Sequence, residues 1–144
     1  MSNSKSQKSY QDLLATLQEI DDRFLSDEWS ITSEQDQALG YRYIMHVLQS
    51  ALLSHFEGDP DWPEWKRIVS PTRKFTGDNS DSIYYETPIR GDRAYRITGN
   101  LAGAVYTSFT IEANAEDGKY ASNNAGVFND EDLDVDADGN YELV

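Results

Sequence analysis

The chain has 144 residues, of which 38% are hydrophobic and 12% aromatic, and its formal net charge is −14. This length and hydrophobic content suit one domain with a buried core and argue against a purely disordered chain. The negative charge argues against a nucleic-acid binder and against adsorption to anionic membranes, because both need an excess of cations.

The chain contains no cysteine, which excludes disulfides and thiolate metal sites. Residues 1–8 are polar and no apolar stretch follows them, so we do not expect them to act as a secretory signal. No apolar run approaches the ~20 residues that a membrane span requires. We therefore expect a cytoplasmic protein with neither membrane nor nucleic acid as a partner.

Apolar residues recur at intervals of three and four in two stretches of the first half of the chain. This spacing predicts two amphipathic helices that form a helical pair over residues 9–57. Ser9 is expected to cap the first helix, after a disordered N-terminus over residues 1–8. Thr32 or Ser33 is expected to cap the second.

The second half is rich in β-branched and aromatic residues bounded by turn residues, with turns expected at Gly91-Asp92 and Gly99-Asn100. The predicted strands are residues 83–86, 94–97, 104–111, 126–128, 133–135 and 141–143. No segment between them is long enough for a helical crossover, so the strands should pair antiparallel. Many short strands at even spacing favour a sandwich or a jelly roll.

The predicted fold class is therefore α+β, with a helical pair followed by an antiparallel β domain over residues 58–144. The chain ends at Val144, directly after the apolar positions Tyr141 and Leu143. We expect this β domain to be part of a longer jelly roll, because chain termini usually carry a frayed polar tail.

Several segments of the chain resemble one bacterial family. They read GYRY at 40–43, GDP at 58–60, SPTRKFTGDNSDSIYY at 70–85, YRITG at 95–99, AVYTSFT at 104–110 and NDEDL at 129–133. Together they resemble proteins that carry the domain of unknown function 1214 and its companion domain 1254. The resemblance covers most of residues 33–144 and implies the front portion of two consecutive jelly rolls. It implies no reaction and no catalytic residues.

One polar cluster stands at the start of a predicted strand, within a segment that has a small basic excess between two acidic flanks. The candidate ligand-binding residues are Arg73, Lys74, Asp78, Asn79, Asp81 and Tyr85. Their charges could bind a small polar or anionic ligand, with the arginine as a two-pronged donor. The alternative, which we favour, is a network of Asx turns that serves the backbone.

A second candidate is Asp134, Asp136 and Asp138, whose D-x-D-x-D-G spacing opens a calcium-binding EF-hand loop. The Glu that should close the loop at its twelfth position would fall beyond the end of the chain, and the flanks resemble strands. A β-hairpin with an acidic turn is therefore the favoured interpretation. Calcium stays open as the one candidate cofactor; we expect no other.

Trp62 and Trp65 form a third candidate. They could make a platform for sugar stacking, but docking of the helices onto the sheet is the favoured interpretation, because tryptophan buries a large area.

No nucleophile elbow or phosphate-binding loop is present in the sequence. The leading hypothesis is therefore a noncatalytic structural or ligand-binding jelly-roll module, acting within a longer protein or a homo-oligomer. The alternatives are an enzyme that acts on a small polar or anionic substrate at residues 73–85, and a calcium-stabilised β domain.

Overall fold

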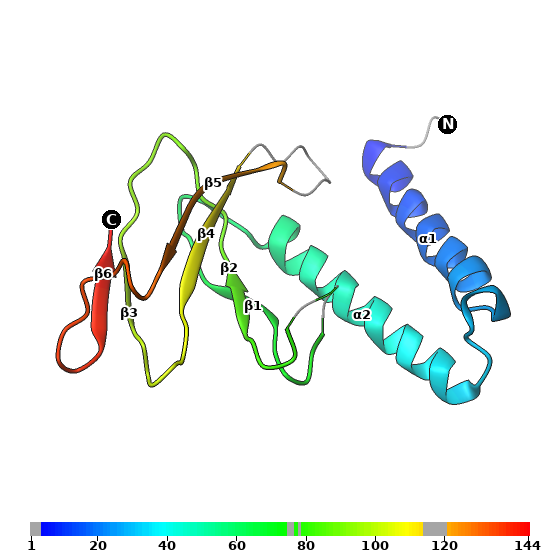
Figure 1. Ribbon diagram of the computed structural model, residues 1–144. Helices are drawn as coiled ribbons and strands as arrows, with labels where there is room; N and C mark the ends of the chain where they lie inside the picture. Colours follow the sequence, from blue (N-terminus) through cyan, green and yellow to red (C-terminus); the bar gives the residue numbers. More distant parts are fainter. Residues whose placement is uncertain (1–3, 75–76, 78, 114–120) are drawn as a thin grey trace. The chain divides into compact units, whose positions relative to one another are not determined.

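The computed structural model describes residues 4–74, 77, 79–113 and 121–144. Its contacts divide the chain into two compact units, Met1–Arg90 and Gly91–Val144. The first unit holds α1 (Lys5–Phe24), the short 3-10 helix η1 (Asp27–Trp29), α2 (Glu34–Phe56), β1 (Lys66–Val69) and β2 (Tyr84–Glu86). The second holds β3 (Ile97–Asn100), β4 (Ser108–Ala113), β5 (Asn123–Asn129) and β6 (Asn140–Leu143) (Figure 1). The predicted α+β order is confirmed.

The boundary between the units differs from the segments expected from the sequence. The first two strands belong with the helices, so the division falls at residues 90/91 and not at 57/58. The first two strands group with the helices because α2 packs on β1, a tertiary contact.

The first helix begins earlier than predicted. Ser4 caps it by accepting a hydrogen bond from the backbone N–H of Gln7 at 3.1 Å. Lys8 and Asp12, one turn apart, form an ion pair at 2.7 Å. The expectation of a disordered segment is therefore wrong for residues 5–8, since lysine and glutamine are good helix formers and Ser4 satisfies a terminal N–H group.

The second helix agrees with its prediction at both ends. Ser33 caps it, accepting from the backbone N–H of Asp36 at 3.1 Å. It ends at Phe56, two residues before Gly58. Local capping and helix-breaking chemistry is therefore sufficient to place this helix.

All strand pairs are antiparallel, as predicted: β1 pairs with β2, β3 with β6, and β4 with β5. Some predicted bounds are wrong. β3 starts at Ile97, β4 starts at Ser108, and residues 133–135 contribute a single bridge between Val135 and Tyr141. β1 was not predicted, because four residues carry little periodic signal.

The predicted turn at Gly99-Asn100 is also wrong, because both residues lie inside β3. Gly99 is opposite Tyr141 in the ladder with β6, and a Cβ atom on Gly99 would collide with the Tyr141 ring. That ring also meets Phe109 of β4, with centroids 5.9 Å apart. Glycine is thus placed here by the close approach of an aromatic ring, and the ring links the two ladders of the second unit.

Burial in the described residues is sparse. Val69 at the end of β1 is their one almost fully buried hydrophobic side chain, at 2% exposure. Two polar residues are also buried, Ser50 of α2 and Ser70, which are 3% and 5% exposed. In the second unit the inward positions of β3, β4 and β6 alternate with exposed ones but are only half-buried. The strands therefore have the period-2 pattern of a sheet with one covered face.

We predict that Gly99→Ala destabilises the second unit by about 1–3 kcal/mol, because the added methyl group must displace the Tyr141 ring. The measurement is urea unfolding followed by amide NMR signals of β3 and β6. Gly91→Ala is the matched control, since a Cβ atom at Gly91 meets nothing within 4 Å. The stability of this variant should equal that of the parent chain. Equal stability of both variants would contradict the prediction.

Candidate functional site

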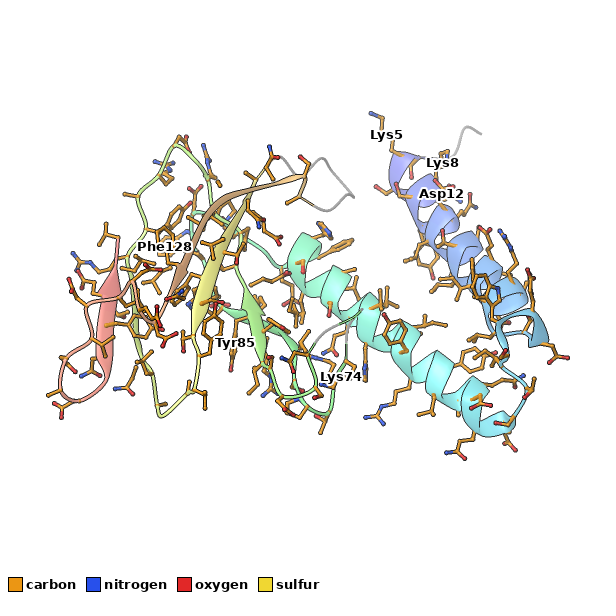
Figure 2. The ribbon with its side chains drawn as sticks, in the orientation of Figure 1. Lys5, Lys8, Asp12, Lys74, Tyr85 and Phe128 are labelled. Carbon is orange, nitrogen blue, oxygen red and sulfur yellow. The ribbon has the colours of Figure 1, made fainter. Side chains whose placement is uncertain are left out.

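The candidate residues at 73–85 follow β1 along the chain and extend into β2, within the first unit; Figure 2 labels Lys74 and Tyr85. Directly after β1, Ser70 and Arg73 exchange two backbone hydrogen bonds of 2.9 and 3.0 Å. The ammonium group of Lys74 then donates to the backbone carbonyls of Asn79, at 3.4 Å, and Ser80, at 3.0 Å. This lysine therefore holds the far side of the loop.

The side chain of Asn79 likewise serves the backbone, since its Oδ1 accepts from the N–H of Asp81 at 3.2 Å. Asp81 accepts from the hydroxyl of Ser80 at 3.3 Å. Tyr85 lies on β2 and is 54% exposed. Asp78 lies outside the described residues. For Lys74 and Asn79, the turn network that the sequence analysis favoured is the one the structure contains.

Arg73 differs from these neighbours. Its Nε atom is buried and has no hydrogen-bond partner among the described residues. An unpaired buried N–H group costs about 1–3 kcal/mol. Of the candidate residues that the structure describes, Arg73 is the one with a buried donor atom, Nε, that has no hydrogen-bond partner in this part of the chain.

A polar seam, which we define as His46, Ser50, Ser54 and Glu86, runs along α2 on the side of β2. The first three recur every four residues and share one helix face. His46 Nδ1 lies 3.3 Å from the carbonyl oxygen of Lys74, and the Ser54 hydroxyl is hydrogen-bonded to the Glu86 carboxylate. The Ser50 hydroxyl is buried without a partner among the described residues.

The sequence analysis missed this polar seam. Its one sequence signal is the four-residue spacing of the polar residues 46, 50 and 54. Glu86 is 32 residues from Ser54 in the sequence and gives no such signal.

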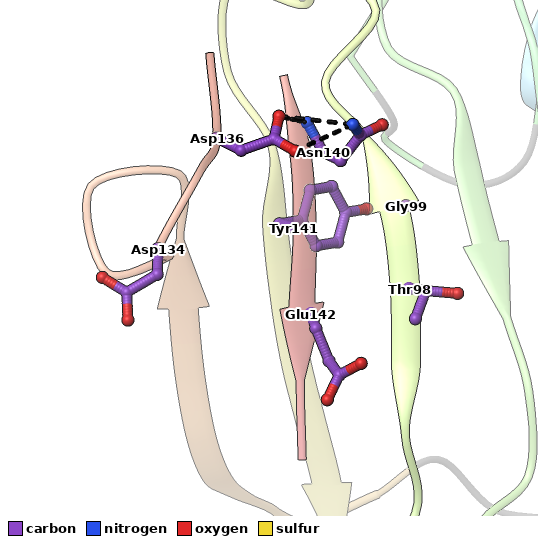
Figure 3. Close-up of a pocket in the computed structure, with 7 residues that line it drawn as sticks. All are labelled: Thr98, Gly99, Asp134, Asp136, Asn140, Tyr141 and Glu142. Carbon is purple, nitrogen blue, oxygen red and sulfur yellow. Dashed lines mark hydrogen bonds between the residues drawn. The ribbon is translucent and has the colours of Figure 1, made fainter. Parts of the chain in front are cut away.

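The aspartates at residues 134–140 form a tight acidic turn in the second unit (Figure 3). The Asp136 carboxylate accepts from the backbone N–H groups of Asp138, at 2.9 Å, and Asn140, at 2.8 Å, and also from the Asn140 side-chain amide at 3.0 Å. Gly139 closes the turn with a φ of 85° and donates to the Asp136 carbonyl at 3.0 Å. The acidic turn is present and is closed by a single bridge between Val135 and Tyr141.

Hydrogen bonding lowers the pKa of Asp136 below its usual value of 3.8. The largest cause is the side-chain amide of Asn140, followed by its backbone N–H. These donors favour the charged carboxylate. Asp136 is thus an acceptor for its own turn.

A pocket of about 560 Å³ lies beside this turn, and β3 and β6 form its floor (Figure 3). It is lined by Thr98, Gly99, Asp134, Asp136, Asn140, Tyr141 and Glu142. Of its three acids, Asp136 is held in the turn and Glu142 lies 3.6 Å from the Arg96 guanidinium. In the described part of the chain, no three Asp, Glu or His side chains lie close enough together to hold a metal ion.

Trp62 is not docked as the sequence analysis favoured. Trp62 is 80% exposed and Trp65 is 48% exposed. The docking interpretation is therefore wrong for Trp62.

Neither α1 nor α2, among the residues that are described, is apolar enough along its length to cross a membrane.

Comparison with solved structures finds one similar fold. It is the crystal structure of an uncharacterised protein from Burkholderia cenocepacia, with a TM-score of 0.76 and 27% sequence identity. The match covers 96% of this chain and 38% of that one, so the present chain spans well under half of its length. No family model and no curated protein matches the chain.

We predict that the Asp136 carboxyl titrates with a midpoint below 3.8, because hydrogen bonds in the fold favour its charged form. The lowered pKa stabilises the folded turn at pH values above the pKa that Asp136 has in the unfolded chain. This stabilisation is lost as the pH falls through the lowered pKa of the folded state. NMR titration of the carboxyl carbon, with hydrogen exchange at Asp138 and Asn140, measures both effects. Asp134→Ala is the control and should leave the midpoint unchanged; a midpoint at or above 3.8 in the parent chain would refute the assignment.

Proposed function

We propose that this chain is a noncatalytic structural or ligand-binding module of the jelly-roll type, working within a longer protein or a homo-oligomer in the cytoplasm. The observation that carries the proposal is the sparse burial. Among the described residues, 21 large hydrophobic side chains are exposed, against one that is almost fully buried. A self-contained domain of this length covers far more of its apolar surface. The exposed side chains therefore fit a module whose faces are covered by further protein.

The sheets support the same proposal. Each sheet that the structure describes has two strands, so each strand has one edge without a ladder partner. Two-stranded sheets are marginal in water, and open edges accept additional strands. A jelly roll, with eight strands in two sheets, would supply them.

The comparisons are compatible with such a module. The Burkholderia cenocepacia protein contains a fold like this one within a chain of which it is 38%. The sequence resemblance to proteins with domains 1214 and 1254 likewise implies the front portion of a double jelly roll. We therefore propose that the strands of this chain pair with further β structure of that kind.

We predict that the chain, held monomeric by dilution, unfolds with less than half the enthalpy of a complete domain. A complete domain of 144 residues should absorb about 100 kcal/mol, at about 0.7 kcal/mol per residue near 60 °C. Scanning calorimetry at a concentration where sedimentation shows a monomer gives the measurement. A single transition with the full enthalpy would show a complete core and refute the proposal.

A second candidate function rests on Arg73. Its buried, unpartnered Nε favours binding of a small polar or anionic ligand, including the substrate of an enzyme, beside the polar seam. The loop residues Lys74 and Asn79 would then act as supports that fix the backbone around the arginine.

We predict that, if Arg73 binds anions, inorganic phosphate or a small dicarboxylate raises the melting temperature of the chain and Arg73→Gln abolishes the increase. Binding to the folded state alone stabilises it in proportion to the logarithm of ligand concentration. Arg67→Gln is the control, because Arg67 is an exposed arginine on the neighbouring strand β1. The same increase in the Arg73 variant, or none in the parent chain, would rule out this candidate.

A further inference from the structure

An apolar groove of about 460 Å³ lies between α1 and α2 in the first unit. Leu13, Leu17, Ile20 and Phe24 form one wall, and Ile44 and Val47 contribute to the other. The four residues on α1 are spaced by three and four and so form one continuous stripe. Leu13 and Phe24 are 39% and 40% exposed. The groove is thus an apolar surface open to solvent.

One end of the groove is held by specific contacts. The Leu25 side chain lies against Gly40, where a Cβ atom would collide with it. The Tyr41 hydroxyl is hydrogen-bonded to the Asp21 carboxylate, which ties the last turns of α1 to the start of α2. The two walls are therefore fixed relative to each other at this end.

The charges on α1 identify the occupant. Lys5 and Lys8 lie in its first turns (Figure 2), whereas its end holds Glu19, Asp21 and Asp22 against a single base, Arg23, which pairs with Glu19 at 2.6 Å. A second α1 that runs antiparallel would place its basic end beside this acidic end, and the reverse would hold at the other end. Over its whole length α1 has three basic and four acidic side chains, so two copies can approach despite the net charge of −14.

We propose that the groove is the interface between two copies of this chain, with α1 of each copy antiparallel in the groove of the other. Such an interface is isologous, because the same surface serves both copies. It has an apolar centre from the stripe of four residues on α1 and a charged rim, as stable interfaces do. The proposal goes beyond the function proposed above, because it concerns the helices and not the strand edges.

The first test is the mass of the intact chain by sedimentation velocity up to about 100 µM. We expect a dimer, and we expect Val47→Glu to weaken it at least about tenfold by placing a charge in the apolar centre. Met45→Glu is the matched control on the same helix, since Met45 is 51% exposed and lies outside the groove, and it should leave the dimer intact. A monomer at all concentrations, or equal effects of the two variants, would overturn the proposal.

The second test uses charge exchange, which leaves the apolar side chains in place and decides the matter if Val47→Glu fails to fold. Lys8→Glu and Asp22→Lys should each weaken the dimer about three- to tenfold, and the double variant should restore it to within about threefold. Circular dichroism of each variant controls for loss of helix. Additive weakening in the double variant would show that something other than an antiparallel α1 occupies the groove.

The outcomes also separate this interface from the jelly-roll proposal. Variants on α1 and α2 report on the groove, whereas the unfolding enthalpy of the monomer reports on whether the chain completes its own core. A chain that stays monomeric and unfolds with a low enthalpy would overturn the dimer proposal and leave the jelly-roll proposal standing. A dimer formed through the groove, whose dissociated monomer unfolds with the full enthalpy, would overturn the jelly-roll proposal and leave the dimer proposal standing.

Discussion

Val69 lies at the end of β1, the strand on which α2 packs, and it is the one hydrophobic side chain that the described residues bury almost completely. Ordering each residue of a chain costs about 1–2 kcal/mol in backbone entropy, and apolar burial is the main term that offsets it. The helices and ladders of this chain have well-formed local hydrogen bonds, but those contribute only about 1 kcal/mol each. The stability of the protein therefore depends on what covers its apolar faces.

Many polar side chains form their hydrogen bonds with residues that are near them in the sequence. Lys74 and Asn79 bind backbone groups within their own loop, and Asp136 binds the backbone of its own turn. Buried or constrained loops need such partners, since their carbonyls and N–H groups lack ladder bonds. These three side chains, which resemble ligands in the sequence, are here part of the structural support.

The first unit combines two kinds of helix surface on α2. The face with Ile44 and Val47 is apolar and lines the groove with α1. The face with Ser50 and Ser54 is polar and reaches Glu86 of β2. The Ser50 hydroxyl on this polar face is buried without a partner among the described residues. The apolar face has no such requirement and suits association with another helix.

The sequence by itself determined the features that depend on local chemistry, such as helix caps and tight turns. The start of α2 at Ser33 follows from a side-chain cap, and the acidic turn around Asp136 follows from Asx and glycine preferences. The antiparallel pairing follows from the lack of crossover segments. The cap and the acidic turn depend on residues within a few positions of one another, and the pairing direction depends only on the length and composition of the connecting segments.

Only the tertiary structure decided the features that join distant segments. Gly99 belongs to a strand and not to a turn, because the Tyr141 ring occupies the space beside it. The contact of Ser54 with Glu86 follows from the meeting of α2 and β2, which are 32 residues apart at this point. Local hydrogen bonds leave a periodic or positional mark in the sequence, whereas a contact between distant residues depends on which surfaces meet once the loops have closed.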